Sequence, residues 1–153
     1  MEEGRRLEAA SGGAVPGTRL IRELEAIGRT VRFCEGDRVM VEGQPGKGIY
    51  ILRSGSARVS MAAHNGETIE LRTLQHGDFI GLSSTLSCEH CCYSVESSRA
   101  SEFTFVQADR AHEFLRSRPD LCLEVIQLLG QEMSALCNER AILNATKPVQ
   151  IER

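Results

Sequence analysis

The side chains best suited to metal or redox chemistry lie in one run, Cys88-Glu89-His90-Cys91-Cys92. Thiolates and imidazoles are natural zinc ligands, and Cys88 and Cys91 form a Cys-x-x-Cys pair. No second pair of ligands is evident, and the adjacent Cys91 and Cys92 point in different directions if the chain is extended. Three interpretations stay open. We favour a loop with incidental thiols over a thiol or redox sensor, and over a metal site with Cys88, His90 and Cys91 as candidate ligands.

The remaining thiols and imidazoles are scattered. Cys34, Cys122 and Cys137 sit in apolar patterns, which predicts buried small residues. A lone histidine is most often an ordinary surface residue, and we expect this of the other three, His64, His76 and His112. A catalytic Gly-x-Ser-x-Gly motif, a P-loop and the His-x-His pattern of cupin metal enzymes are all absent from the sequence. The sequence therefore does not predict an enzyme.

Composition narrows the class further. The 153 residues carry a formal net charge of −3 and no cluster of Lys and Arg, so we expect no direct DNA binding by this chain. No apolar run reaches the length that spans a bilayer, and the first 17 residues lack the apolar core of a secretory signal. These features predict a flexible N-terminal arm over residues 1–17, a cytoplasmic location and no membrane partner.

Residues 31–106 have a sequence pattern typical of an all-β domain. Short runs rich in β-branched and aromatic residues recur about every ten residues, separated by glycine-containing turns such as Asn65-Gly66, a good hairpin turn. We expect strands in five places: 39–41, 49–52, 57–61, 68–71 and 103–106. This pattern predicts a sandwich or barrel.

Helices flank this body. Apolar residues at helical spacing predict a short amphipathic helix from Thr18 to Ile27, and Asp109 is suited to cap another that ends at Arg116. Pro119 suits the first turn of a long helix over 118–144, with a polar tail over 145–153. A helix on a β-body needs only one apolar face, yet this one carries a second stripe at coiled-coil spacing. We therefore expect a homodimer through Ile126, Leu129, Met133, Leu136 and Leu143; the alternative is a wide face buried within one subunit.

The order of the predicted helices and strands, and the residues within them, resemble the cyclic nucleotide-binding domain. The stretch 41–59 (VEGQPGKGIYILRSGSARV) is similar to that domain's opening turn and strands, and 71–81 (LRTLQHGDFIG) to the run into its phosphate-binding cassette. The stretch 109–144, with Arg118-Pro119-Asp120, resembles the two C-terminal helices of the Crp/Fnr branch. The resemblance covers residues 18–144. It implies a mainly β, double-stranded β-helix (jelly roll) with flanking helices and a long C-terminal dimerisation helix.

The cassette departs from the family pattern. In the family, a Glu after the cassette glycine binds the ribose, and an Arg about ten residues later neutralises the cyclic phosphate. Here Leu82 follows Gly81, and the Arg position falls on Cys91 or Cys92. The positions that reach the base fall near Leu136 and Cys137, and the remaining polar groups of the cassette are Ser83 and Ser84.

This departure predicts a regulatory module whose pocket binds cAMP or cGMP weakly or not at all. One alternative is a different nucleotide or other anionic small molecule at Gly81, Leu82, Ser83 and Ser84; another is redox sensing through the Cys88–Cys92 run. Crp/Fnr regulators continue into a helix-turn-helix domain, for which the chain as given has no room after Arg153. We therefore expect a stand-alone module or the sensor part of a longer transcriptional regulator.

Overall fold

The computed structural model describes the backbone of residues 18–146 and the side chains of residues 18–134. The predicted arm over 1–17 and the last seven residues of the predicted tail lie outside this part. So do the side chains of Leu136, Cys137 and Leu143.

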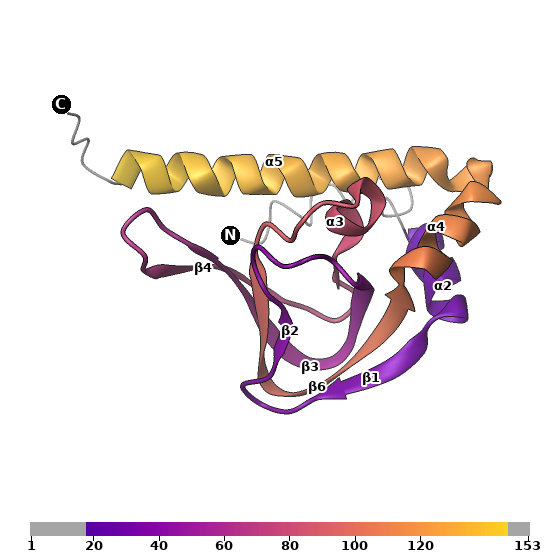
Figure 1. The fold of residues 1–153 in the computed structure, drawn as a ribbon, viewed down its shortest axis with the longest axis horizontal. Helices are drawn as coiled ribbons and strands as arrows, with labels where there is room; N and C mark the ends of the chain where they lie inside the picture. The colour runs from indigo at the N-terminus through magenta and orange to yellow at the C-terminus, as the bar shows by residue number, and fades with distance from the viewer. Residues whose placement is uncertain (1–17, 147–153) are drawn as a thin grey trace.

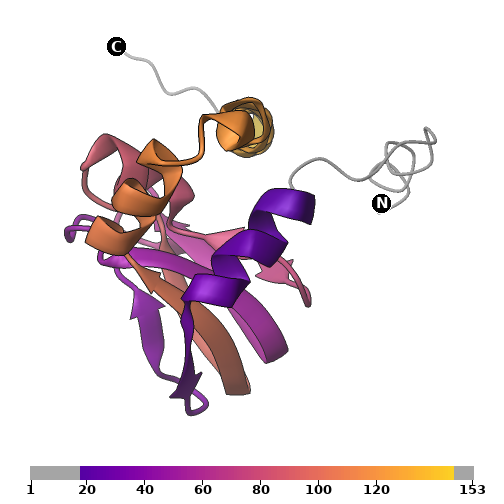
Figure 2. The same ribbon diagram turned by 90° about the vertical axis from the view of Figure 1, so that its right-hand side faces the viewer.

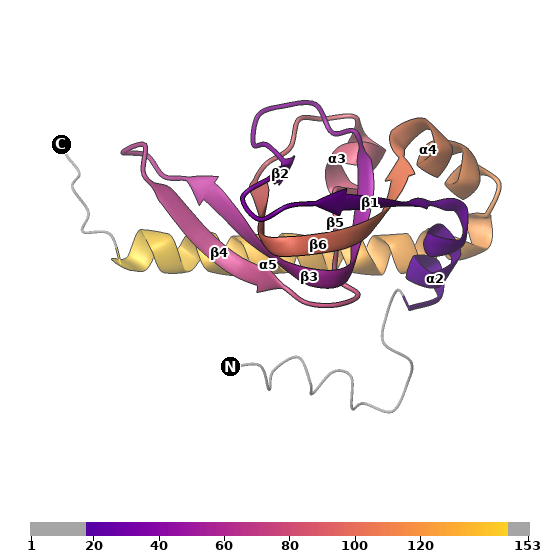
Figure 3. The same ribbon diagram turned by 90° about the horizontal axis from the view of Figure 1, so that it is seen from below.

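An antiparallel β-roll forms the body of the molecule (Figure 1). Its strands are β1 (Arg29–Phe33), β2 (Arg38–Met40), β3 (Gly48–Ala62), β4 (Thr68–Leu74), β5 (Phe79–Ile80) and β6 (Ser94–Gln107). The sheet order is β1-β6-β3-β4, with β2 paired to β6 and β5 paired to β3. Seen from below, β6 runs between β1 and β3 (Figure 3). The prediction of a mainly β body is confirmed.

The two longest strands are longer than the sequence pattern predicted. The predicted strands 49–52 and 57–61 are parts of one strand, because β3 continues through Ser54 and Gly55 with register shifts between Leu52 and Ala57. Gly55 has a φ of +97°, and a Cβ there would lie 2.2 Å from the hydroxyl of Ser101. Glycine at this position therefore lets β3 bend against β6, and the pairing of the two strands continues on both sides of it.

Within residues 18–146, five helical segments flank the roll: α2 (Thr18–Ile27), α3 (Leu82–Ser87), α4 (Ala108–Arg116), the 3-10 turn η1 (Pro119–Leu121) and α5 (Cys122–Thr146). The helix predicted over 118–144 is thus a 3-10 turn followed by an α-helix that extends two residues further. Asp109 lies in the first turn of α4, whose cap is Gln107 with no side-chain cap bond. Helices α2 and α4 lie at the end of the roll where α5 begins (Figure 1), and seen end-on α5 lies above them, with α4 and α2 on either side (Figure 2).

Alternation along β3 divides the interior into two clusters. Tyr50 and Leu52 point into the roll, whereas Ile49 and Ile51 point toward the helices, as the two-residue period of a strand requires. The second cluster joins α2 to the long helix through Leu20, Leu24, Leu121 and Leu128, each at most 4% exposed, in contact with the outer face of β3. Apolar burial therefore fixes the first turns of α5 on the roll.

Two Gly-Asp pairs, Gly36-Asp37 and Gly77-Asp78, form the same type of turn. In each turn the aspartate carboxylate accepts a 2.7 Å hydrogen bond from the N–H three residues earlier, at Cys34 for Asp37 and at Gln75 for Asp78. The glycines Gly36 and Gly77 adopt φ near +90°. Each turn also exchanges two backbone hydrogen bonds with a strand, so both Gly-Asp pairs are structural corners of the roll.

Candidate functional site

The candidate cassette comprises Gly81, helix α3 and the segment 88–92 that leads into β6. Gly81 precedes α3 with a φ of +87°, and a Cβ there would lie 2.3 Å from the carbonyl oxygen of Gly48 at the start of β3. The close approach that requires glycine is thus between two backbone segments of the protein itself. The cassette helix is consequently seated directly on the sheet.

The first residues of α3 divide between the core and the surface. Leu82, at the family's ribose-binding position, is 1% exposed and packs in the cluster beneath the helices. Ser83 is exposed, whereas Ser84 is buried and lies against Gly46, where a Cβ would come within 2.6 Å of its hydroxyl. Of these two hydroxyls, Ser83 alone is exposed to solvent.

Segment 88–92 is held by the loop that follows β2. The N–H of Gly43 donates to the carbonyl of Cys91 at 2.8 Å, and the N–H of Cys91 donates to the carbonyl of Gln44 at 2.9 Å. A β-bridge between Pro45 and His90 continues this pairing. The backbone around Cys91 is therefore paired on one side, and its side-chain direction is set by this short ladder.

Cys91 and Cys92 point to opposite sides of this ladder. Cys91 is 5% exposed and belongs to the cluster inside the roll. Burial raises the pKa of its thiol, while the neighbouring Ser84 hydroxyl acts in the opposite direction. Cys92 is exposed at a hollow between α3 and α5, where burial and then the Glu132 carboxylate raise its pKa. Neither position carries a cationic side chain.

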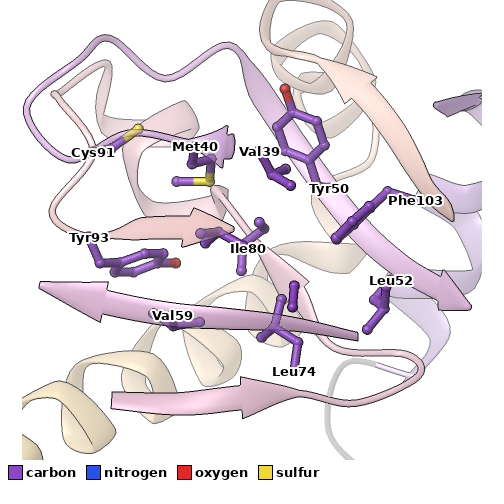
Figure 4. Packing of buried hydrophobic residues seen from close by; sticks show 12 residues of the cluster. Val39, Met40, Tyr50, Leu52, Val59, Leu74, Ile80, Cys91, Tyr93 and Phe103 are labelled. Atoms are coloured by element: carbon purple, nitrogen blue, oxygen red, sulfur yellow. The ribbon is translucent and has the colours of Figure 1, made fainter. Parts of the chain in front are cut away.

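The space inside the roll is filled by side chains of the protein. Figure 4 shows Met40, Ile80, Cys91 and Tyr93 packed together, with Tyr50 and Phe103 continuing the cluster. Each of these residues is at most 8% exposed. The rings of Tyr50 and Phe103 meet edge to face with centroids 6.1 Å apart. The interior next to the cassette is thus apolar and close-packed.

Tyr93 and Glu132 join the roll to the long helix, and the sequence pattern did not single out Glu132. The hydroxyl of Tyr93 donates a 2.8 Å hydrogen bond to Oε2 of Glu132, while Oε1 is shielded from solvent and has no partner. Burial raises the pKa of Glu132, and the Tyr93 hydrogen bond and then Arg72 counteract it. A carboxyl group therefore lies beside the segment where the family places its arginine.

The metal-ligand candidates are not brought together. Cys88 ends α3, with its sulfur 3.9 Å from Nε2 of His112, whereas Cys91 is directed into the core. His90 is exposed, and among the side chains of residues 18–134 no group of three or more His, Cys, Asp or Glu is placed to hold a metal ion. The contact between Cys88 and His112 joins residues 24 positions apart and has no local signal in the sequence.

Two predictions about cysteines are wrong. Cys34 and Cys122 are exposed, because Cys34 lies at the Gly36-Asp37 turn and Cys122 faces outward at the start of α5.

The described part of α5 presents exposed apolar side chains at Leu123, Ile126 and Met133, with Leu129 partly buried. None of the described helices is both long and apolar enough to cross a membrane.

Comparison with known proteins decides the family. The model of the cyclic nucleotide-binding domain matches residues 30–118, which is more than half of the chain. The chain belongs to the cyclic nucleotide-binding domain family. The expected jelly roll is thereby confirmed, and a catabolite activator protein is among the proteins that share the fold. No curated protein sequence matches the chain.

Solved structures with this cyclic nucleotide-binding fold resemble the chain at low sequence identity. A transcriptional regulator from Thermotoga maritima is 16% identical with a TM-score of 0.66, covering 82% of this chain and 98% of that one. The catabolite activator protein of Thermus thermophilus is 16% identical with a TM-score of 0.71, covering 89% and 62%. The c-di-GMP responsive regulator CLP of Xanthomonas campestris is 14% identical with a TM-score of 0.68, covering 84% and 66%. These likenesses show the shared fold.

Proposed function

We propose that this chain is a regulatory sensing or interaction module, and not an enzyme, whose cyclic nucleotide pocket no longer suits cAMP or cGMP. The observation that carries the proposal concerns the two positions, Cys91 and Cys92, where the family pattern calls for a phosphate-binding arginine: Cys91 is buried in the core, and Cys92 lies near the Glu132 carboxylate. Leu82, at the ribose position, is equally buried and has no polar group to offer.

The energetic consequence is large. Arginine–phosphate pairs are among the strongest hydrogen-bonded contacts, and loss of one partner of such a pair costs about 2–5 kcal/mol. Loss of the bond to the ribose hydroxyl costs roughly a further 1–3 kcal/mol. Together these losses would take a micromolar site to about millimolar or weaker. The carboxyl of Glu132 near Cys92 adds repulsion toward a phosphate whenever it is ionised.

Titration calorimetry of the whole chain with cAMP and cGMP tests this proposal. We expect dissociation constants of about 1 mM or weaker for both nucleotides. The variant Cys91→Ala is a matched control, because it keeps the site uncharged and should bind no better. Micromolar binding of either nucleotide to the unmodified chain contradicts the proposal.

A second candidate function is binding of a different nucleotide or anionic ligand at the cassette. A hollow of about 450 Å³ lies between α3 and α5, with Ser83, Ser87 and Glu132 among its lining residues. An anion would enter more readily when Glu132 is protonated, so its affinity should rise as the pH falls. Cyclic di-GMP is a suitable probe, because the similar Xanthomonas regulator responds to it. Absence of binding at both about pH 5 and about pH 8 excludes this probe as the ligand.

We further infer that α5 pairs with a second copy of the chain. Leu123, Ile126 and Met133 are between 63% and 65% exposed on a helix that already uses Leu128 to pack on the roll. Exposed apolar side chains repeated along a helix are typical of an interface.

The similar Thermotoga protein is described as a transcriptional regulator, and we propose a comparable cytoplasmic role in transcription regulation for the protein that contains this domain.

A further inference from the structure

Strands β3, β4 and β6 meet at a hollow of about 650 Å³ that shares no residue with the cassette. Its lining includes hydroxyl, amide, imidazole and guanidinium side chains: Ser54, Thr73, Gln75, His76, Ser98 and Arg99. Among the described residues that line the hollow, none is acidic, and Arg99 carries the permanent positive charge. Groups that can donate hydrogen bonds to an anion are therefore gathered at one place.

Arg99 differs from the other arginines of these three strands, because they are neutralised by carboxylates. Each of the others forms an ion pair: Arg53 with Glu25, Arg58 with Glu96 and Arg72 with Asp78. Glu102, which pairs in register with Ser54, is bound by Arg32. Within residues 18–134 the exposed Arg99 side chain has no ion pair or hydrogen bond of its own. The nearby carboxylates are thus engaged elsewhere, and the hollow retains a net positive charge that attracts anions.

The backbone that carries Arg99 is held in place by buried hydroxyl groups. Register shifts in the pairing of β3 with β6 leave Ser98 as an extra residue beside Arg99. Such bulges redirect side chains and are frequent next to functional sites. The Ser97 hydroxyl donates a 3.1 Å hydrogen bond to the carbonyl oxygen of Arg99, and the Ser101 hydroxyl lies 2.7 Å from the same atom. A guanidinium on a fixed backbone loses less conformational entropy when it binds a ligand.

The chemistry and the size of the hollow together indicate a class of ligand. A guanidinium forms paired hydrogen bonds with phosphate, and these are among the strongest contacts to an anion. The volume lies within the range of roughly 300–1,000 Å³ that is typical of small-molecule sites, and a phosphate ion alone would occupy only part of it. Hydroxyl and amide side chains are suited to hydrogen-bond a carrier that is itself rich in hydroxyl groups.

We propose that this hollow binds a sugar phosphate, with Arg99 holding the phosphate group and the neighbouring hydroxyl and amide side chains contacting the sugar. The site is separate from the cassette, so it does not depend on whether the cassette binds a nucleotide.

A nuclear magnetic resonance titration of the whole isotope-labelled chain tests the proposal. Ribose 5-phosphate, inorganic phosphate and ribose are added separately, and sodium chloride keeps the ionic strength constant. We expect ribose 5-phosphate to cause saturable shifts at residues 54–56, 73–76 and 98–99, with a dissociation constant of about 1 mM. Inorganic phosphate should bind at least about threefold more weakly, and ribose should cause no shift at about 10 mM.

Three outcomes of the titration contradict the proposal. Absence of saturable shifts at the hollow with about 20 mM ribose 5-phosphate overturns it. Shifts confined to residues 81–92 would assign the ligand to the cassette instead. Equally tight binding of inorganic phosphate would overturn the contacts with the sugar.

The variant Arg99→Gln isolates the contribution of the guanidinium. Glutamine keeps a polar side chain but removes the charge, so we expect the dissociation constant of ribose 5-phosphate to rise at least tenfold, to about 10 mM or weaker. Arg116→Gln removes the same charge from an exposed position at the end of α4 that does not line the hollow, and it is the matched control. Its dissociation constant should stay within about twofold of the parent value. Equal weakening in the two variants would show general attraction by the net charge and would overturn the site.

Discussion

Tyr93 and Glu132 form the side-chain hydrogen bond that links the roll to α5 among the described residues, with 2.8 Å between the phenol oxygen and Oε2. Tyr93 is 3% exposed, so the bond lies away from solvent. The second carboxylate oxygen has no partner, which leaves an acceptor whose burial is uncompensated when Glu132 is ionised. Ionisation of Glu132 is therefore expected to destabilise the contact between the roll and α5.

The first prediction concerns the variant Glu132→Gln and pH. Burial raises the pKa of Glu132 above 4.5, so folding favours the protonated form. The contribution of this group to stability is thus fully present below its unfolded pKa and is lost as the pH rises through the folded pKa. The glutamine variant lacks this loss. Its free energy of unfolding in urea, relative to that of the parent, should therefore increase by on the order of 1 kcal/mol between about pH 4 and about pH 8.

The difference in the free energy of unfolding between the parent and Glu132→Gln reports on this carboxyl group, because all other carboxyl groups are common to both proteins. Tyr93 does not titrate in this window, since its burial and the Glu132 carboxylate raise its pKa well above 10. A free-energy difference that is constant with pH, or one of opposite slope, contradicts the prediction.

The second prediction separates steric contact from backbone conformation at the cassette glycine. Gly81→Ala combines a φ of +87° with a Cβ 2.3 Å from the Gly48 carbonyl oxygen, so we expect a loss of more than about 3 kcal/mol or failure to fold. Gly66 has a φ of +86° with no atom within 4 Å of a Cβ, so Gly66→Ala should cost only about 1–2 kcal/mol. Chemical unfolding of both variants provides the comparison, and similar losses would show that the approach to Gly48 is unimportant.

The third prediction tests the dimer. Ile126→Glu places a charge on the exposed apolar face of α5, and two copies would bring like charges together at a cost of several kcal/mol. Sedimentation analysis should show at least about a hundredfold weaker association. Gln127→Glu adds the same charge one residue further along, at another exposed position, and is the matched control. If the parent is monomeric, or if the two variants behave alike, α5 is not the interface.

The fourth prediction asks whether α2 belongs to the folded unit. Leu24 is 1% exposed beneath the helices, so Leu24→Ala should lower the free energy of unfolding by about 2–5 kcal/mol. Arg22 is exposed on the same helix and lies outside the proposed interface, so Arg22→Ala should stay within about 0.5 kcal/mol of the parent. Thermal unfolding of the two variants makes the comparison, and a small effect at Leu24 would mean that α2 is a dispensable attachment.

Local patterns predicted the elements that depend on local physics. The helix Thr18–Ile27 has the predicted bounds, because its apolar spacing and the glycine after it are both local signals. The glycine turns were also predictable, since φ near +90° at Gly36, Gly66 and Gly77 is a property of the residue itself. β1 was not predicted as a strand, because only one face of its alternating sequence is partly buried and its pairing is with the distant β6.

The candidate site was less predictable because its contacts join distant segments. The sequence pattern predicted that Cys91 and Cys92 diverge, but only the pairing of 88–92 with the loop after β2 shows which one enters the core. The pairs Tyr93–Glu132 and Cys88–His112 span 39 and 24 positions and cross from one element to another. A glutamate on an amphipathic helix gives no sign that its carboxyl is partly buried until the helix is packed.

The contact between Gly81 and Gly48 also constrains how a signal could travel through the domain. At this contact backbone meets backbone, so no side chain of Gly81 or Gly48 can repack to change their separation. We therefore expect Gly81 and the start of β3 to move together. A displacement of α3 would then reach the rest of the domain through its contacts with α4 and at the hollow that it shares with α5.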